Sequence, residues 1–423
     1  MPDISAAPDR SGGPLSDVRV LDMTRVIAGP LATQILGDLG ADVIKVERPQ
    51  GGDDVRQVGP PWMPPSGIAE QSTYFQSVNR NKRSIALSFE TAEGQQLLHD
   101  IAREADVFVE NFRPGTLARY GLGYEQLSAI NPRLVYCSVS GFGQTGPYAS
   151  RSGYDYLAQG MAGLMNVTGH PSSEAGGGPM RVGIPLVDIF AGMNAGLGIL
   201  AALRHRDATG QGQHVDISLF DSGLASMLNP VSAWFNSHEA IGLTSNDHPS
   251  AAPYGVFPVD DGFIIIATFS DREFIRLAAA LGHPEWIDDP KFARNAARVA
   301  HRAELKEVVA DALKGRGKHE WVTLLNAATV SCGPLNTMAD IEQDPHVGER
   351  GLIATMQHPT VGPIHAAASP LRLSASPVSY RIAPPLPGEH GDEILRDVLG
   401  LDEARIAELR RNGVVGDDGR MPA

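Results

Sequence analysis

The sequence predicts an α/β protein with a parallel sheet covered by helices on both faces, followed by a smaller α+β domain. Five short apolar runs occur in the first 140 residues, and segments of helical periodicity lie between most of them. Continuous apolar strands that alternate with helices are typical of parallel sheets, because such strands are buried on both faces. After about residue 225 the pattern changes to turn-linked strands and amphipathic helices, which indicates the second domain.

The predicted elements of the first domain alternate regularly along the chain. The expected strands are 18–23, 41–47, 84–89, 106–111 and 134–140. The expected helices between them are 30–40, 91–105 and 123–132. A long helix rich in glycine and alanine is expected at 189–205. Its glycines indicate close packing, because each would weaken an isolated helix by about 1 kcal/mol. The turn TGQGQ at 209–213 then leads into a strand at 214–220.

The remaining elements define the second domain and the C-terminal part. We expect strands within 249–269, amphipathic helices at 270–282 and 302–315, a strand at 358–374 and a helix pair at 391–415. The predicted organisation is a flexible tail at 1–15, a large domain at 16–224, a small α+β domain at 225–335, and a part at 336–423 that packs back on the large domain.

Composition excludes several classes of partner and site. The chain has 35 Lys and Arg against 49 Asp and Glu, a net charge of −14, which argues against nucleic acid or an anionic membrane as the main partner. Cys137 and Cys332 are too few for a disulfide framework, and the histidines lack metal-ligand spacing. No run of about 18 apolar residues and no signal peptide is apparent, so we expect a cytoplasmic protein without a metal site.

The glycine-rich segment GFGQTG at 141–146 matches the pattern of a dinucleotide-binding loop. Such a loop needs a helix immediately after it, so that the pyrophosphate meets the helix N-terminus. The continuation PYASRSGYD is instead typical of a loop. We therefore interpret the segment as a loop that lets backbone or ligand approach closely, with NAD binding as the alternative.

Asp188 is the main catalytic candidate, because it lies where an apolar run gives way to the long helix. An aspartate there commonly caps a helix or lies in its first turn. Its apolar and small neighbours would also desolvate the carboxylate and make it reactive. Arg48 follows the second predicted strand, where an open α/β sheet binds ligands, so it is a candidate phosphate contact or a solvated side chain.

Taken together, the blocks resemble class III CoA-transferases of the CaiB/BaiF type, such as formyl-CoA transferase. The resemblance begins at VRVLDMTRVIAGPLATQILGDLGADVIKVERPQGGD, continues through ADVFVENFRPGTLARYGLGYE and GIPLVDIFAGMNAGLGILAAL, and covers essentially residues 16–415. The sequence is most similar to the branch that transfers CoA between succinyl-CoA and dicarboxylates. The resemblance implies a Rossmann-like large domain and an interlocked homodimer that acts on acyl-CoA and carboxylate substrates without any other cofactor.

The resemblance also implies roles for individual residues. It makes Asp188 the nucleophile that forms an aspartyl-CoA thioester. The residues that it places at the CoA site are Arg48, Asn111, Phe112, Arg119, Tyr154, Asp155, Ile27 and Ala28. A dicarboxylate would also need a cation for its second carboxylate, for which the candidates are Arg25, Arg80, Arg151 and Arg181.

Three departures from the family pattern narrow the expected reaction. Arg25 and Ile27 stand where formyl-CoA transferase has a histidine and a glutamine, which argues against formyl or oxalate specificity. Glu90 stands where some members have a phosphate-binding lysine. Tyr154 replaces the histidine of α-methylacyl-CoA racemase, and a tyrosine is a poor base at neutral pH. CoA transfer is therefore the predicted function, with racemisation on the same scaffold as the alternative.

Overall fold

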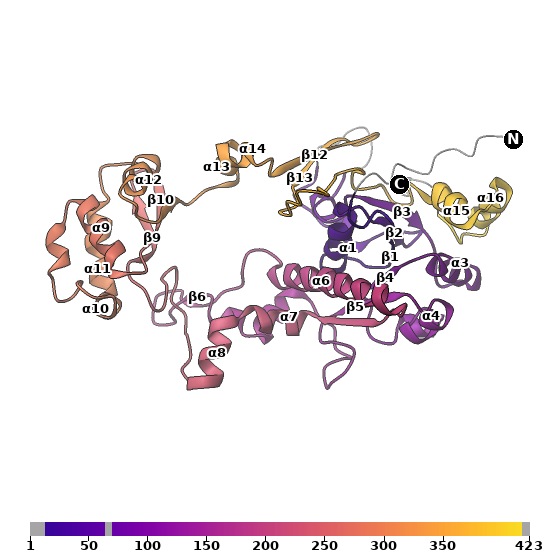
Figure 1. Cartoon of the computed structure of the whole chain (residues 1–423), viewed down its shortest axis with the longest axis horizontal. Helices are drawn as coiled ribbons and strands as arrows, with labels where there is room; N and C mark the ends of the chain where they lie inside the picture. The colour runs from indigo at the N-terminus through magenta and orange to yellow at the C-terminus, as the bar shows by residue number, and fades with distance from the viewer. Residues whose placement is uncertain (1–12, 64–69, 417–423) are drawn as a thin grey trace. The chain divides into compact units, whose positions relative to one another are not determined.

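The computed structural model describes residues 13–63 and 70–416, which form two compact units (Figure 1). Unit 1 comprises Met1–Leu164, Val182–Leu228 and Arg350–Ala423, and unit 2 comprises Met165–Arg181 and Asn229–Glu349. Most of the tail expected at 1–15 lies outside the described residues.

Unit 1 contains a six-stranded parallel sheet in the order β3-β2-β1-β4-β5-β8. Its strands are β1 (Arg19–Asp22), β2 (Asp42–Glu47), β3 (Lys82–Ala86), β4 (Val107–Glu110), β5 (Val135–Ser140) and β8 (His214–Ser218). The α/β class with a parallel sheet is confirmed. The chain winds outward in both directions from the neighbouring strands β1 and β4, so this pair marks the switch point, beyond whose carboxyl ends such sheets bind ligands.

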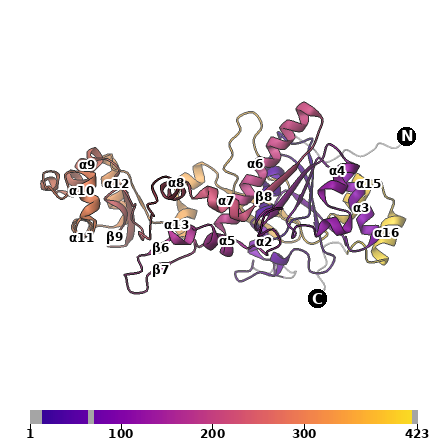
Figure 2. The ribbon, with the colours of Figure 1, turned by 90° about the horizontal axis from the view of Figure 1, so that it is seen from below.

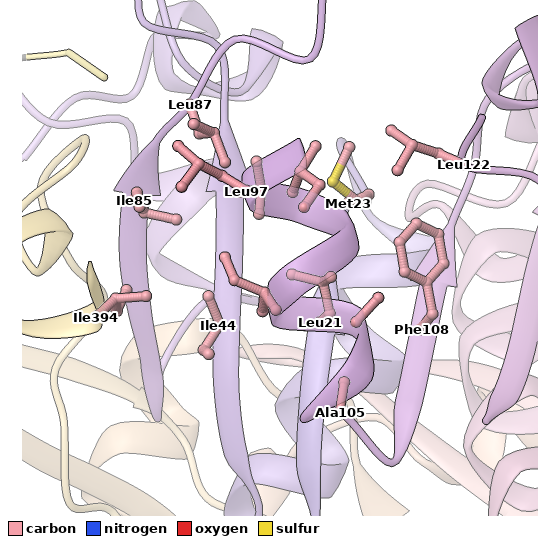
Figure 3. Packing of buried hydrophobic residues seen from close by; sticks show 14 of the residues in the cluster. Leu21, Met23, Ile44, Ile85, Leu87, Leu97, Ala105, Phe108, Leu122 and Ile394 are labelled. Atoms are coloured by element: carbon pink, nitrogen blue, oxygen red, sulfur yellow. The ribbon is translucent and has the colours of Figure 1, made fainter. Parts of the chain in front are cut away.

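Helices cover both faces of this sheet. On one face lie α1 (Ala28–Asp38) and α6 (Leu186–Thr209), and on the other lie α3 (Ala92–Arg103), α4 (Tyr124–Ile130), α15 (Gly391–Leu399) and α16 (Glu403–Arg411). Figure 2 shows α6 on the opposite side of the strands from the other group. Figure 3 shows the core on that second face, where Leu21, Ile44 and Phe108 from the strands meet Leu97 and Ile394 from the helices.

Helix α6 packs closely against its neighbours because of its glycines. A Cβ atom on Gly192 would lie 2.6 Å from the Ala28 carbonyl oxygen of α1, and one on Gly198 would lie 2.8 Å from a Val215 methyl group of β8. Contrary to the sequence-based expectation, α6 is long and apolar enough to cross a membrane by composition alone. Its buried residues, such as Ile199, belong to the core beside the sheet, which accounts for its apolar character.

The C-terminal part returns to the first half of unit 1. Ile394 and Leu409 join the core of the sheet, and Val415 forms an antiparallel bridge with Leu87. The segment expected as one strand at 358–374 is instead part of a hairpin of β12 (Ile353–His358) and β13 (Gly362–Ala367). The remaining helices of the unit are α2 (Thr73–Gln76), α5 (Asp155–Met161) and α7 (Leu219–Ser226), with the 3₁₀ turns η1 (Asp54–Gln57) and η2 (Leu117–Tyr120).

Unit 2 has an antiparallel sheet of β11 (Cys332–Pro334), β10 (Gly262–Ala267) and β9 (Tyr254–Val259). Phe257 and Ile264 are cross-strand partners whose side chains join Phe274 and Trp321 in the core. The helices are α9 (Asp271–Leu281), α10 (Asn295–Ala300), α11 (Arg302–Ala312), α12 (Lys318–Ala327), α13 (Met338–Gln343) and α14 (Pro345–Glu349), preceded by α8 (Leu228–Ser237).

The boundaries of unit 2 differ from those of the predicted small domain. The short strands β6 (Gly169–His170) and β7 (Gly178–Pro179) belong to unit 2, although they precede α6 in the chain. The Ser245 backbone N–H donates to the Gly169 carbonyl oxygen at 3.0 Å, and the Ser245 hydroxyl lies 3.0 Å from His170 Nδ1. These tertiary hydrogen bonds leave no local signal in the sequence, so pattern alone places Met165–Arg181 with the preceding strands.

Candidate active site

A cavity of about 350 Å³ lies beyond the carboxyl ends of β1, β4 and β5 in unit 1. The loop after β1 contributes Ile27 and Ala28, and the loop after β4 contributes Asn111 and Phe112. Tyr154, Asp155 and Asp188 complete the set of predicted site residues that line it. The structure thus brings together seven of the nine predicted residues at the switch point of the sheet.

The loops after β1 and β4 are joined to each other. Asn111 Oδ1 accepts the Arg25 backbone N–H at 2.9 Å, and Asn111 Nδ2 donates to the Arg25 carbonyl oxygen at 2.6 Å. The next residue, Val26, adopts a left-handed conformation with φ of 70°, which is unusual for a β-branched residue. Its N–H donates to Asp53 Oδ1 at 3.2 Å, so side chains of two other segments hold the strained loop in place.

The glycine-rich segment after β5 forms a loop, and no helix begins until Asp155. Gly141 and Gly153 lie so close that a Cβ atom on either would come within 2.5 Å of the other residue's backbone. The N–H groups of Gly143 and Gln144 donate to Ser140 Oγ and to Asp216 Oδ2, both at 2.9 Å. The segment therefore brings two backbone stretches together and lacks the helix N-terminus that a dinucleotide site requires.

Asp155 caps the helix that carries Asp188. The α6 helix begins after Pro185, whose side chain cannot accept a hydrogen bond. Asp155 Oδ1 accepts the N–H groups of Val187 at 2.8 Å and Asp188 at 3.2 Å, while Gln159 Nε2 donates to Asp155 Oδ2 at 2.7 Å. Sequence pattern made Asp188 a candidate for the cap of α6, but Asp155 is the residue that caps this helix. The Asp188 carboxylate is therefore available to the cavity.

The Asp188 carboxylate is buried without compensation. The residue is 9% exposed, and no hydrogen bond or ion pair to its side chain occurs among the residues that the structure describes. Burial, together with the nearby negative charge of Asp155, raises the pKa of Asp188 to about 7. A desolvated carboxylate beside a cavity is a candidate nucleophile, because no hydrogen bond or counter-ion stabilises its ground state.

A second cavity of about 240 Å³ shares Arg25 and Phe112 with the first. It is also lined by Arg48, Glu90 and Tyr120, among others. Arg48 forms an ion pair with Asp54 and donates to the Gly52 carbonyl oxygen at 3.3 Å. Arg119, in η2, is exposed and lines neither cavity.

The four arginines proposed for a second substrate carboxylate lie in different settings. Arg80 is buried and forms a two-pronged ion pair with Asp38 at 2.6 and 2.8 Å, so it is not available, and that expectation is wrong. Arg25 lines the cavity and pairs with Asp54 at 3.1 Å. Arg151 lines the cavity and stacks on the Tyr148 ring at 3.9 Å, whereas Arg181 belongs to unit 2.

The sequence interpretation overlooked Arg113, which also lines the Asp188 cavity. Its guanidinium donates to the Ser152 hydroxyl at 3.4 Å. The signal was its position directly after Phe112, beyond the carboxyl end of β4. Within the described ranges, no group of three or more His, Cys, Asp or Glu side chains is arranged to hold a metal ion.

A buried aspartate beside a cavity at the switch point of a doubly wound sheet is suited to an enzyme that transfers groups between bound ligands. The chain belongs to CoA-transferase family III, whose family model matches residues 15–391, and it is a CoA-transferase. It is 41% identical to succinate–glutarate CoA-transferase of Agrobacterium fabrum, over 92% of this chain and 96% of that protein. It is 39% identical to human succinyl-CoA:glutarate CoA-transferase, over 95% of this chain and 90% of that protein.

A solved structure supports the same assignment. A CaiB/BaiF family protein from Brucella suis superposes with a TM-score of 0.83 at 40% identity, over 92% of this chain and all of that chain. The predicted resemblance is therefore confirmed, and the alternative of a racemase is not favoured by these relatives.

Proposed function

We propose that this enzyme transfers CoA from succinyl-CoA to a second dicarboxylic acid of similar length, such as glutarate, through an aspartyl-CoA thioester on Asp188. The observation that carries the proposal is the buried Asp188 carboxylate, which faces the cavity and has no partner among the described residues. The relatives named above supply the substrate class, because their names join succinate or succinyl-CoA with glutarate.

The proposed reaction consists of four acyl transfers. Asp188 attacks the thioester carbonyl of succinyl-CoA, the C–S bond breaks, and a mixed anhydride and CoA thiolate result. The thiolate then attacks the Asp188 carbonyl carbon of the anhydride, which releases succinate and leaves the aspartyl-CoA thioester. The acceptor carboxylate attacks this thioester and again expels the thiolate. The thiolate finally attacks the acceptor carbonyl of the new anhydride, which yields the new acyl-CoA and frees Asp188.

Residues in and around the two cavities are candidates for binding the two ends of the substrates. We assign CoA binding to Ile27, Ala28, Arg48, Asn111, Phe112, Arg119, Tyr154 and Asp155, as the family resemblance implies. For the second carboxylate of the acid we propose Arg151, because it lines the cavity of Asp188 and has no acidic partner in the part of the chain that is described. Arg25, by contrast, already pairs with Asp54.

We further propose that the enzyme works as a cytoplasmic homodimer that needs no metal or redox cofactor. The outer face of α6 exposes apolar side chains, with Leu197 67% and Met193 53% exposed, and α5 exposes Tyr156 in the same way. Apolar side chains gathered in this manner mark a surface that a partner covers. A second copy of the chain is the partner that the family resemblance implies.

Product analysis tests the proposed function. The enzyme is incubated with succinyl-CoA and a panel of mono- and dicarboxylic acids, and the acyl-CoA products are identified by mass spectrometry. We expect new acyl-CoA from C5 and C6 dicarboxylates, and little from monocarboxylates of the same length. Incubation of a branched acyl-CoA in D₂O without an acceptor should give no deuterium at the α-carbon. Efficient α-carbon exchange without acyl transfer would contradict the proposal.

A further inference from the structure

Glu110 is a buried acid that the proposed mechanism does not use. It is the last residue of β4, is 6% exposed, and lines neither cavity of unit 1. Its Oε2 atom accepts the Phe112 backbone N–H at 2.8 Å. The carboxyl group therefore closes the turn that presents Asn111 and Phe112 to the cavity without itself lining that cavity.

This turn connects several groups of the site. Asn111 bonds the backbone of Arg25 through both its amide atoms, and the Arg25 guanidinium lies over the Phe112 ring, 4.8 Å from its centroid. A displacement of the Phe112 backbone would therefore move a residue that lines both cavities and the arginine packed on it. Among the described contacts, the Phe112 N–H has Glu110 as its acceptor, and a buried N–H without an acceptor is costly.

A polar chain lies behind Glu110 and responds to its protonation. The Ser138 hydroxyl of β5 lowers the pKa of Glu110 by stabilising its ionised carboxylate, and the same hydroxyl lies 2.9 Å from His214 Nε2 of β8. Because a hydroxyl has one proton, a Ser138 hydroxyl that donates to an ionised Glu110 cannot also donate to His214.

Among the described residues, the groups that interact with the Glu110 carboxyl group include no cation. Asp216 of β8 repels its negative charge, while Tyr136 and Cys137 of β5 contribute neutral groups, and burial lowers the pKa of His214. On the side of β1, Arg25 approaches the turn, but its guanidinium pairs with Asp54. Burial, together with Asp216, raises the pKa of Glu110 to about 7, so Glu110 changes its charge in the range in which enzymes operate.

We propose that Glu110 is a positioning residue for acyl-CoA binding, whose ionised carboxylate holds the Asn111–Phe112 turn in the shape that the acyl-CoA site requires. The proposal rests on the proposed function, since it takes Asn111 and Phe112 as acyl-CoA contacts. An ionised carboxylate accepts a shorter and stronger hydrogen bond from the Phe112 N–H than a protonated one does. The hydrogen bond that holds the turn therefore becomes stronger as the pH rises through the pKa of Glu110.

Two variants of Glu110 test this role. Glu110→Ala removes the acceptor, and Glu110→Gln keeps an acceptor of the same shape but cannot ionise. For Glu110→Ala we expect the KM for succinyl-CoA to rise roughly 10- to 100-fold, with kcat within about threefold of wild type. For Glu110→Gln we expect the ratio of its KM to that of wild type to be near one at pH 6 and about threefold at pH 8.5. Glu125→Ala, an exposed change in α4 of the same unit, is the matched control and should leave KM unchanged.

Each result decides for or against the proposal. An unchanged KM in Glu110→Ala, or a KM ratio for Glu110→Gln that stays constant from pH 6 to 8.5, would overturn it. The ratio needs only the isosteric glutamine variant, so the test stands even if the alanine variant does not fold. Loading of wild-type Asp188 by succinyl-CoA alone checks the proposed function separately. If succinyl-CoA acylates wild-type Asp188 but the Glu110 variants leave KM unchanged, the positioning role of Glu110 is refuted while the proposed function stands.

Discussion

The two halves of the parallel sheet bury carboxylates in opposite ways. In the β1–β3 half every buried acid named here has a cation beside it. The pairs are Lys82 with Asp22 at 3.0 Å, Lys45 with Asp53 at 3.0 Å, and Arg56 with Glu47 at 2.7 Å. In the half formed by β4, β5 and α6, Glu110 and Asp188 are buried with no ion pair in the described ranges.

The pKa values of Glu47, Glu110 and Asp188 illustrate this difference. Burial would raise the pKa of Glu47, but the charge of Arg56 and its hydrogen bonds lower it to about 2. Burial raises the pKa of Glu110 and of Asp188 to about 7, because no cation offsets it. A carboxylate held by a cation stabilises the scaffold and is a poor nucleophile, whereas an unpaired one is costly to bury and available for chemistry. The comparison therefore distinguishes buried carboxylates that form ion pairs within the scaffold from unpaired ones in or beside the candidate active site.

The largest effect is expected from Asp188→Asn. An amide cannot attack a thioester, so turnover should fall by at least about 10⁴-fold. Measurement of acyl-CoA products over hours of incubation checks this prediction. Asp54→Asn, which changes an exposed acid at the rim of the same cavity, provides a comparison and should retain most of kcat. Turnover near the wild-type level in Asp188→Asn would refute the assignment.

In the β1–β3 half of the sheet we expect a substitution to lower stability rather than turnover. Glu47→Gln leaves Arg56 buried without its counter-ion, which should lower the free energy of unfolding by roughly 3–5 kcal/mol. The matched change Glu110→Gln removes a buried charge that has no cation, so it should cost less than about 1 kcal/mol. Urea unfolding of the two variants at pH 8 compares them directly. Equal losses would remove the distinction between the halves.

The raised pKa of Asp188 predicts how stability depends on pH. Between about pH 4 and pH 7 the unfolded chain has already lost the proton that the folded state retains, so the free energy of unfolding falls as the pH rises through this window. Asp188→Asn lacks this dependence and should be more stable than wild type by roughly 2–4 kcal/mol at pH 8. Urea titrations at pH 5 and pH 8 measure the difference, which should grow with pH. A difference that is constant or absent would contradict the desolvated state of Asp188.

The smallest effect is expected from Asp155→Asn. Its amide oxygen still accepts the N–H groups at the start of α6, but the negative charge next to Asp188 is lost. The pKa of Asp188 should therefore fall, and the acid limb of the kcat/KM profile should move to lower pH. Asp155→Ala also removes the cap and should cost about 1 kcal/mol of stability. An acid limb that does not move would show that Asp155 acts on α6 alone.

Much of the fold could be predicted from the sequence because the sheet is buried on both faces. All of the predicted strands of the large domain formed close to their expected bounds, since they contain consecutive apolar residues such as Val107, Phe108 and Val109 of β4. The association of Met165–Arg181 with unit 2 could not be predicted, because it depends on contacts with residues far along the chain. The strand expected at 358–374 became a hairpin, since alternation alone does not mark where a turn such as that before Gly362 falls.

Most residues that line the candidate site could be named from the sequence, but their hydrogen bonds and ion pairs could not. Sequence pattern offered Asp188 as a helix cap or a nucleophile, and only the position of Asp155 shows which residue caps α6. Sequence pattern does not distinguish Arg80 from Arg151 as a contact for a substrate carboxylate. The structure does, because Arg80 forms an ion pair with Asp38. No sequence motif marks Glu110 as a positioning residue. That role rests on its hydrogen bond with the Phe112 backbone and the absence of a neighbouring cation among the described residues.

Trapping of the acyl-enzyme tests the central claim most directly. The enzyme is mixed with succinyl-CoA and no acceptor, quenched with hydroxylamine, digested and mapped by mass spectrometry. A thioester or anhydride on an aspartate is activated relative to a free carboxylate and should become a hydroxamate. We expect a hydroxamate on the peptide that contains Asp188 and none on the peptide that contains Asp155. A hydroxamate only on Asp155, or on neither residue despite sustained turnover, would contradict it.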